Sequence, residues 1–270
     1  MSSVALQGNA SGTGAFVVAS PNSNSNRTLT LPDQTGTLVS GTTAAGVAVP
    51  AGTTTLAPIL LTSGTNLTSA TAGAVEYDGK VVYATPLGTQ RGIVPMQQYY
   101  RLDSALAGAN VNTAQNLLGV GCTLSSSTVY EFEIVFALSR TAGAVSHTVG
   151  IGFGGTATIN NTAYFASGYT NASASALNPY QLYGSSASGI VLGVISSASN
   201  TTLTTATTAA NEVLSLTLKG TVSINAGGTF IPQYTMSAAA GGAFTTVAGS
   251  YIRINPLSAS GANTSVGTWA

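Results

Sequence analysis

Few residues in this chain could do chemistry. Seven Asp and Glu residues and one histidine occur among 270 residues. Glu131 and Glu133 lie two positions apart in a stretch with strand periodicity, which places their carboxylates on one face, roughly 6.5 to 7 Å apart. That separation overlaps the spacing of glycosidase carboxylates. Neighbours on one strand point in parallel and do not straddle a bond, so the pattern does not favour glycan cleavage.

A second carboxylate pair, Glu76 and Asp78, flanks an Asp-Gly turn in the hairpin expected over residues 74–85. The pair could bind a metal or do acid/base work, but solvated hairpin residues are the favoured interpretation. His147 is in phase with Val149, Ile151 and Phe153 and lacks the His or Cys companions of a metal site. A Ser-His-Asp triad needs an acid and a nucleophile on a sharp turn, and the sequence indicates neither. We therefore expect His147 to be a packed or interface histidine.

Two glycine-rich stretches resemble nucleotide-binding motifs. GIGFGG, residues 150–155, matches G-x-G-x-x-G, yet TATINNTAYF follows it where a dinucleotide site needs a helix. We read these glycines as part of a strand. Residues 73–80 resemble a Walker loop only loosely, with Val81 where Ser or Thr is required. The sequence therefore predicts no catalytic residues, no cofactor-binding or metal-binding residues, and no cofactor.

The aromatic residues offer recognition chemistry instead of catalysis. A tyrosine ring is apolar in its body and polar at its tip, which suits a recognition surface, although core or rim positions are an equal alternative for each residue. The tyrosines beside turns or polar residues are Tyr99, Tyr100, Tyr164, Tyr169, Tyr180 and Tyr183. Cys122 is the single cysteine and is expected to be a buried, inert thiol. Trp269 suggests that the C-terminal tail packs back onto another surface, which the sequence does not identify.

Charge is scarce. Charged residues make up 5% of the chain, against about 25% in globular proteins, and the formal net charge is zero. The seven Lys and Arg residues are scattered, which argues against nucleic-acid binding. No apolar run is long enough for a membrane span, and MSSVALQGNASGTG lacks the features of a signal peptide, so we expect synthesis in a cytosol without membrane insertion. A neutral chain of this kind tends to associate.

Apolar residues at alternate positions predict strands. Tyr130, Phe132, Ile134, Phe136 and Leu138 form the clearest stripe. Similar stripes are Val145, His147, Val149, Ile151 and Phe153; Leu214, Leu216, Leu218, Val222 and Ile224, with a bulge or bend at Gly220; and Tyr251, Ile252 and Ile254 before Pro256. Residues 96–108 are the one candidate for a short helix. Residues 185–210 are rich in Ser, Thr and Ala and are expected to form either an exposed excursion or a strand pair at a subunit interface. The fold class expected is all-β, with an antiparallel, jelly-roll-like β-sandwich as the distal domain.

Residues 27–38 read RTLTLPDQTGTL. Leu29 and Leu31 alternate with polar residues, Pro32 stops the strand, and residues 33–36 supply turn chemistry. Together with GTGAFVVASPNSNSN before it, this segment resembles the N-terminal segments of tailed-phage (cyanophage-like) fibres and other virion surface proteins. AGAVEYDGKVVYATP, residues 72–86, followed by RGIVP, looks like the connector before the distal domain of such proteins.

The resemblance implies a virion structural role, commonly as a homotrimer, and carries over no catalytic residue. We expect an N-terminal virion-attachment segment over residues 1–40, an extended and hairpin connector over 41–99, a distal sandwich over 100–258 and a tail over 259–270. The first hypothesis is a short, non-enzymatic fibre that is synthesised in the host cytoplasm, attaches to other virion proteins through residues 1–40, and projects its distal domain toward a host-surface glycan or protein. Alternatives are a capsid decoration or head-fibre protein, a polysaccharide-cleaving tailspike and a bacterial adhesin.

Overall fold

The computed structural model describes residues 49, 51–170, 189–261, 263 and 265–269. The chain divides into two units, residues 1–59 and residues 60–270. All strands of the described residues lie in the second unit, and the predicted attachment segment, residues 1–40, lies outside the described part. The described residues contain no helix, so none that could cross a membrane.

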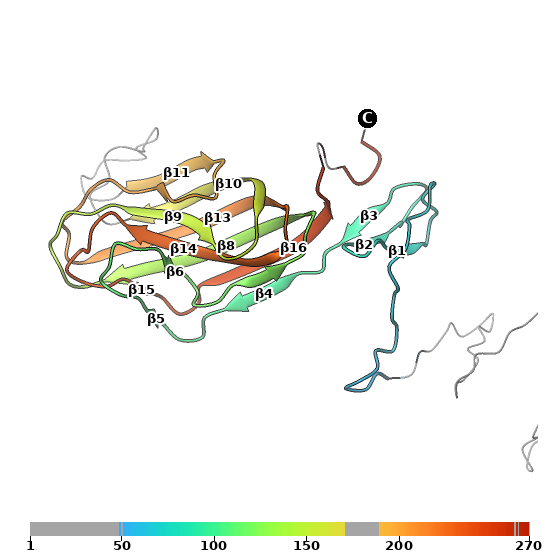
Figure 1. Ribbon diagram of the computed structural model, residues 1–270, viewed down its shortest axis with the longest axis horizontal. Coiled ribbons are helices and arrows are strands. Elements are labelled where there is room, and N and C mark those ends of the chain that lie inside the picture. The colour runs from blue at the N-terminus through green and yellow to red at the C-terminus, as the bar shows by residue number, and fades with distance from the viewer. Residues whose placement is uncertain (1–48, 50, 171–188, 262, 264, 270) are drawn as a thin grey trace, which may run out of the picture. The chain divides into compact units, whose positions relative to one another are not determined.

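Three antiparallel sheets make up the second unit (Figure 1). A small sheet has the order β1 (Val75–Tyr77), β2 (Val82–Ala84), β3 (Gly92–Val94). An eight-stranded sheet has the order β11 (Gly189–Ile195), β10 (Ile159–Thr170), β13 (Glu212–Ile224), β8 (Thr128–Arg140), β15 (Thr245–Thr246), β5 (Leu106–Ala107). Two more strands belong to this sheet outside that order. β16 (Tyr251–Ala259) pairs with β8, and β4 (Gln98–Arg101) pairs with β16. A five-stranded sheet has the order β12 (Thr201–Thr202), β9 (Val149–Gly154), β14 (Gly228–Met236), β6 (Gln115–Asn116), with β7 (Cys122–Leu124) paired to β14.

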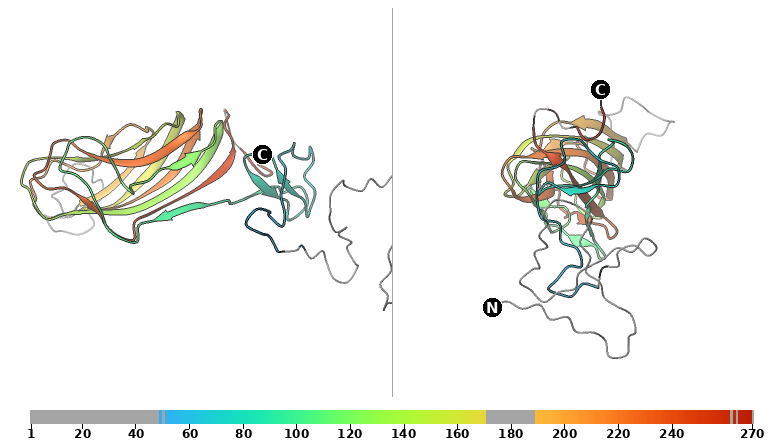
Figure 2. Two further views of the ribbon diagram at one scale, coloured as in Figure 1. Left: turned by 60° about the horizontal axis from the view of Figure 1, so that its bottom comes forward. Right: turned by 90° about the vertical axis from the view of Figure 1, so that its right-hand side faces the viewer.

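The two larger sheets bury their apolar stripes in a common core. The stripe of β8 is confirmed: Tyr130, Phe132, Ile134, Phe136 and Leu138 are each at most 4% exposed. The ring of Phe132 lies 5.4 Å from that of Phe153 on β9 and 5.9 Å from that of Phe230 on β14, which joins the two layers of strands seen in Figures 1 and 2. Alternation therefore places every second side chain of β8 inside and the others on the outer face of the eight-stranded sheet.

The stripe of β13 is also buried, but Gly220 is not a bulge. The register of β13 with β8 is continuous from Glu212↔Arg140 to Ile224↔Thr128. A Cβ on Gly220 would lie 2.1 Å from the Ala163 carbonyl oxygen and 2.5 Å from Tyr164, so a close approach of β10 requires the glycine. The irregularities lie elsewhere, between Ile159 and Asn161 in β10 and between Pro256 and Ser258 in β16, which runs through its proline.

The short helix expected over residues 96–108 is wrong. This stretch forms β4 and β5, because β4 finds a strand partner in β16 and the Leu102 N–H donates to the Ser250 carbonyl oxygen. Local sequence preference here is weak, and pairing with a segment far along the chain overrides it. Of residues 185–210, the first four lie outside the described part, and β11 forms an edge of the large sheet.

The expected hairpin over residues 74–85 is confirmed as β1 and β2, but its turn is longer than two residues. Tyr77 pairs with Val82, so residues 78–81 form the loop. Asp78 Oδ1 accepts from the backbone N–H groups of Lys80 and Val81, and Gly79 has a φ of 91°. One other expectation fails locally, since Val145 is exposed. Residues 51–71 form no strand, which leaves the extended connector of the two alternatives, extended or strand-like.

Candidate interaction surface

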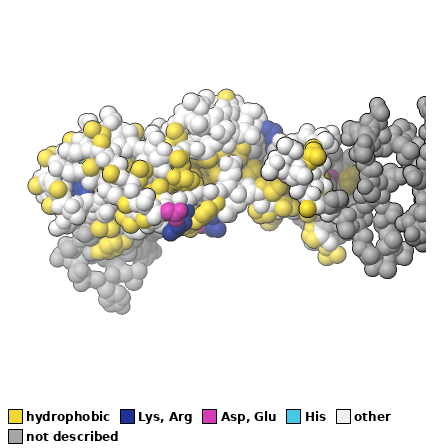
Figure 3. All heavy atoms as spheres, turned by 90° about the horizontal axis from the view of Figure 1, so that it is seen from below, with side chains coloured by type: hydrophobic (Ala, Val, Ile, Leu, Met, Phe, Trp, Pro, Cys, Tyr) yellow, Lys and Arg dark blue, Asp and Glu magenta, His cyan; other side chains and the backbone are white. Residues whose placement is uncertain are grey.

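Most charged side chains of the described residues are paired within the chain. Arg140 Nε donates to Glu212 Oε2 at 2.9 Å, with both side chains fully buried. Arg91 donates to Glu76 at 2.8 Å. The remaining ion pairs, which are more exposed, are Arg253 with Glu133 and Arg101 with Asp103. On the face that Figure 3 shows, charged side chains of the described residues cover only small areas.

The buried cluster lies where β8 ends and β13 begins. Arg140 and Glu212 face each other in the strand register. His147 Nε2 lies 3.0 Å from the same carboxylate oxygen of Glu212, and His147 Nδ1 lies 3.0 Å from the Val145 carbonyl oxygen. The Phe244 ring covers the cluster, with its centroid 5.5 Å from the Arg140 guanidinium carbon. These contacts make His147 a buried, packed residue that braces the loops at this end of the sheets.

Sequence reasoning missed Arg140 and Glu212 as a pair. They stand 72 residues apart, so no local motif links them. One signal was available: Arg140 continues the even-numbered buried stripe of β8, and Glu212 stands in phase with Leu214 and Leu216. A charged residue in a buried phase needs a partner of opposite charge, because an unpaired buried charge is very costly.

The second charged group lies on the outer face of the eight-stranded sheet. Strand register places Lys219 of β13, Glu133 of β8 and Arg253 of β16 side by side in one row, and Glu131 stands one pleat further along β8. Arg253 Nη2 donates to Glu133 Oε2 at 2.7 Å, and the Tyr251 hydroxyl donates to Glu133 Oε1 at 2.9 Å. The hydrogen bond from Arg253 is the main reason that the pKa of Glu133 falls below its ordinary value.

These residues border a hollow of 220 Å³ that is also lined by Gln97 and Asn255. Glu131 and Glu133 are both on this face, as expected, and they project from one strand in parallel. Glu133 is held by Arg253 and Tyr251. The arrangement suits polar contact with another surface and does not place two carboxylates on opposite sides of a bond.

Large apolar side chains are exposed on the same outer face. Phe165 of β10 lies in the row of Lys219 and Glu133 and is 43% exposed, and Val194 of β11, paired with Phe165, is 77% exposed. Tyr169 is also exposed. The face therefore combines exposed apolar groups on β10 and the edge strand β11 with charged groups at its centre.

The tyrosines divide between core and surface. Tyr164 is buried, so of its two alternatives the core position holds and the recognition surface does not, and Tyr180 and Tyr183 lie outside the described residues. Tyr99 and Tyr100 are exposed on the edge strand β4 and line a groove of 360 Å³ with Val120 and Cys122. Cys122 is only partly buried, so the expectation of a buried thiol is wrong in part; the burial that it has raises the pKa of the thiol to about 11, which keeps the reactive thiolate scarce.

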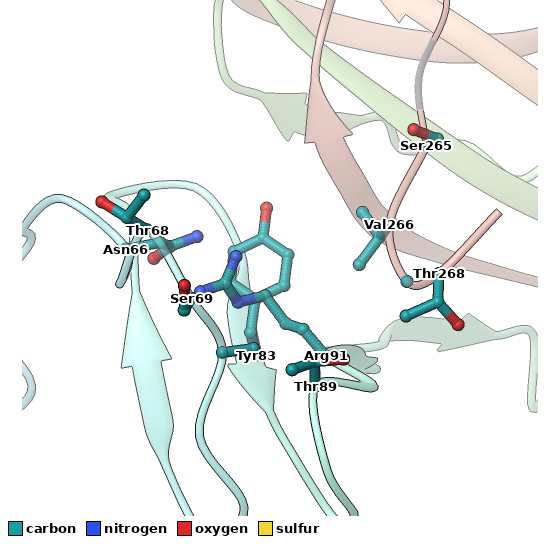
Figure 4. A pocket seen from close by; sticks show the side chains of 11 residues that line it. Asn66, Thr68, Ser69, Tyr83, Thr89, Arg91, Ser265, Val266 and Thr268 are labelled. Carbon is teal, nitrogen blue, oxygen red and sulfur yellow. The ribbon is translucent and has the colours of Figure 1, made fainter. Parts of the chain in front are cut away.

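A polar pocket of 460 Å³ lies beside the small sheet (Figure 4). Asn66, Thr68 and Ser69 line one side, Tyr83 comes from β2 and Arg91 from the position before β3, and residues 265–268 line the other side. Arg91 donates to both oxygens of Glu76 and to the Leu67 carbonyl oxygen, which fixes the segment that carries the pocket's polar side chains.

The carboxylates of the hairpin are structural. Glu76 accepts from the Leu67 N–H, which with Arg91 holds its pKa below the ordinary value. The Tyr83 hydroxyl donates to Asp78 Oδ2 at 2.9 Å. Burial works against ionisation of Asp78, but the Val81 and Lys80 N–H groups outweigh it and its pKa is lowered. The expectation of solvated residues is therefore wrong, because each carboxylate serves as an acceptor that closes a loop.

The remaining predicted positions also lie outside any site of chemistry. Residues 150–155 belong to β9 and the turn after it, so they do not open a helix. Trp269 is 82% exposed and its Nε1 donates to the Val266 carbonyl oxygen, so its ring does not pack against the rest of the described chain. Among the described residues, no group of three or more His, Cys, Asp and Glu could hold a metal ion.

Comparison of the chain with protein-family models, with curated proteins and with solved structures finds no match.

Proposed function

We propose that this protein is a non-enzymatic structural protein of a tailed-phage virion, a short fibre that assembles as a homotrimer. Its N-terminal residues 1–40 fasten it to the particle. Its two large sheets form a jelly-roll-like β-sandwich that projects outward and offers its surface to a host glycan or protein. The resemblance of residues 12–38 and 72–95 to phage proteins is the basis for the virion location and for the trimeric state.

The observation that carries the proposal is the exposed apolar stretch ahead of the small sheet. Residues 51–71 form no strand, yet Leu56, Ile59 and Leu60 are exposed, Leu60 by 81%. Exposed apolar side chains that follow one another so closely are costly in water and mark a surface that a partner covers. Neighbouring copies or a virion component would supply that cover.

The charge distribution supports the same proposal. A fibre or decoration protein must pack strands from several copies together, and each unpaired charge brought into such an interface costs desolvation energy. In the described residues the ion pairs of Arg140, Arg91, Arg253 and Arg101 neutralise charges within the chain. A surface with so little free charge can be covered by other copies at low cost.

Particle incorporation tests the proposal. Deleting residues 1–40 should abolish incorporation while circular dichroism still reports folded strands, and deleting residues 265–270 serves as the matched control that should incorporate normally. Light scattering should give a trimer mass for the purified full chain. A full chain that stays monomeric, or the 1–40 deletion appearing on particles, would refute the proposal.

The position of the protein on the particle separates the fibre from its alternatives. An epitope tag after residue 270, located by electron microscopy, should lie on the tail; a tag on the capsid would assign a decoration protein instead. Host polysaccharide should remain intact after incubation with the protein. Cleavage that disappears in Glu131→Gln would assign a tailspike hydrolase.

A further inference from the structure

Two charged side chains of the described residues, Lys219 and Glu131, form neither an ion pair nor a hydrogen bond within the chain. The others are engaged: Lys80, for example, donates to the Ser126 carbonyl oxygen at 2.6 Å. Lys219 acts on Glu133 only at longer range, and Glu131 acts likewise on Arg253. In a chain with so few charges, two that remain unpaired are an exception to the pattern.

Lys219 and Glu131 lie close together on the outer face of the eight-stranded sheet. Lys219 stands opposite Glu133, and Glu131 stands opposite Thr221, so the two unpaired residues are diagonal neighbours on adjacent strands β13 and β8. They line the same 220 Å³ hollow on the outer face of the eight-stranded sheet. Together with Arg253 and Glu133 they make a group of two positive and two negative charges.

The surroundings of the hollow permit close approach of another protein surface. Several outward positions of the neighbouring strands carry small side chains, namely Ala163, Ser167 and Ser215, which alternate with buried residues. Phe165 and Val194 add exposed apolar area in the row of Lys219. Small residues let a second surface come near, and burial of the exposed apolar groups would stabilise the contact.

The charge pattern selects the occupant. A strongly acidic partner would meet Glu131 and Glu133, and a strongly basic one would meet Lys219 and Arg253, so neither fits the whole group. A second copy of this chain carries the same two positive and two negative charges. If the two copies are shifted slightly against each other, positive charges of one face negative charges of the other. Electrostatic complementarity of this kind fixes partner and register.

We propose that this outer face is the contact between copies of the chain and that Lys219 of one copy pairs with Glu131 of its neighbour. In a closed ring each copy gives Lys219 to one neighbour and Glu131 to the other. The inference rests on the proposed self-assembly and identifies the surface that makes it.

Charge reversal tests the pairing in the full-length protein. Lys219→Glu or Glu131→Lys alone should raise the concentration at which the assembly dissociates by about tenfold or more, because like charges then meet. The double variant Lys219→Glu/Glu131→Lys restores opposite charges and should return the dissociation concentration to within about threefold of wild type, as a coupled pair requires. Light scattering during dilution measures each value.

A matched control places the same new charge elsewhere. Thr123→Glu adds a carboxylate to an exposed position of β7 in the five-stranded sheet and should leave dissociation unchanged. Single reversals without effect, or a double variant as weak as the singles, would overturn the inference while a trimeric wild type leaves the proposed function standing. A wild type that is monomeric at every concentration would overturn both.

Discussion

Replacing Glu212 by Gln should be among the most damaging conservative substitutions in this protein. The side chains of Glu212 and Arg140 are 0% exposed, so the substitution leaves a buried guanidinium without its counter-charge. Removing one partner of a buried ion pair costs about 3 to 5 kcal/mol. Arg140 keeps its hydrogen bonds to the Ala142 and Ala209 carbonyl oxygens, and the new amide can still accept from its Nε, so we expect a loss near 3 kcal/mol at the lower end of that range.

Glu133→Gln is the matched control, since it removes the same charge on the neighbouring strand. Its partner Arg253 is 44% exposed, and pairs of that kind contribute about 0 to 1 kcal/mol. Urea unfolding at one fixed protomer concentration measures both, because assembly makes stability depend on concentration. Equal losses for the two variants would refute the reasoning from burial. The apolar pair Arg140→Met/Glu212→Leu should recover much of the stability, since it removes both buried charges together.

Three further outcomes follow from the packing and the hairpin. Phe136→Ala should lower the free energy of unfolding by about 3 to 5 kcal/mol, because the ring is 2% exposed in the common core; a change near zero would show that the register is wrong. Gly220→Ala should cost about 1 to 3 kcal/mol through the clash with Tyr164, whereas Gly193→Ala, with no atom within 4 Å of the added Cβ, should be nearly neutral by thermal unfolding. Asp78 has a lowered pKa when folded, so its stabilisation is present above the ordinary value of 3.8 and is lost as the pH falls through the folded value. The protection factors of the β1–β2 hairpin amides, which are corrected for the intrinsic slowing of exchange at low pH, should therefore fall in acid, and Asp78→Asn should remove that part of the pH dependence; an unchanged acid profile in the variant would contradict the assignment.

The all-β character and the core stripe of β8 could be predicted because they depend on local alternation. Tyr130 to Leu138 repeat every second residue, and a strand with one buried face requires that spacing whatever its partners are. The hairpin around Gly79 was predictable for a similar reason, since turn chemistry is local. The helix expected over residues 96–108 failed where the local signal was weak and a distant strand, β16, decided the conformation.

The candidate surface illustrates the same division. That Glu131 and Glu133 share a face follows from the sequence alone, but their neighbours come from β13 and β16, whose order in the sheet is set by long-range pairing. The partnership of Arg140 with Glu212 was likewise decided by the register of two strands far apart in the chain. By itself the sequence determined a strand-forming chain with few charges, no net charge and alternating apolar faces. Only the tertiary structure decided which charges meet and which remain without a partner, because ion pairing depends on distances of a few ångströms that residue spacing along one strand cannot specify.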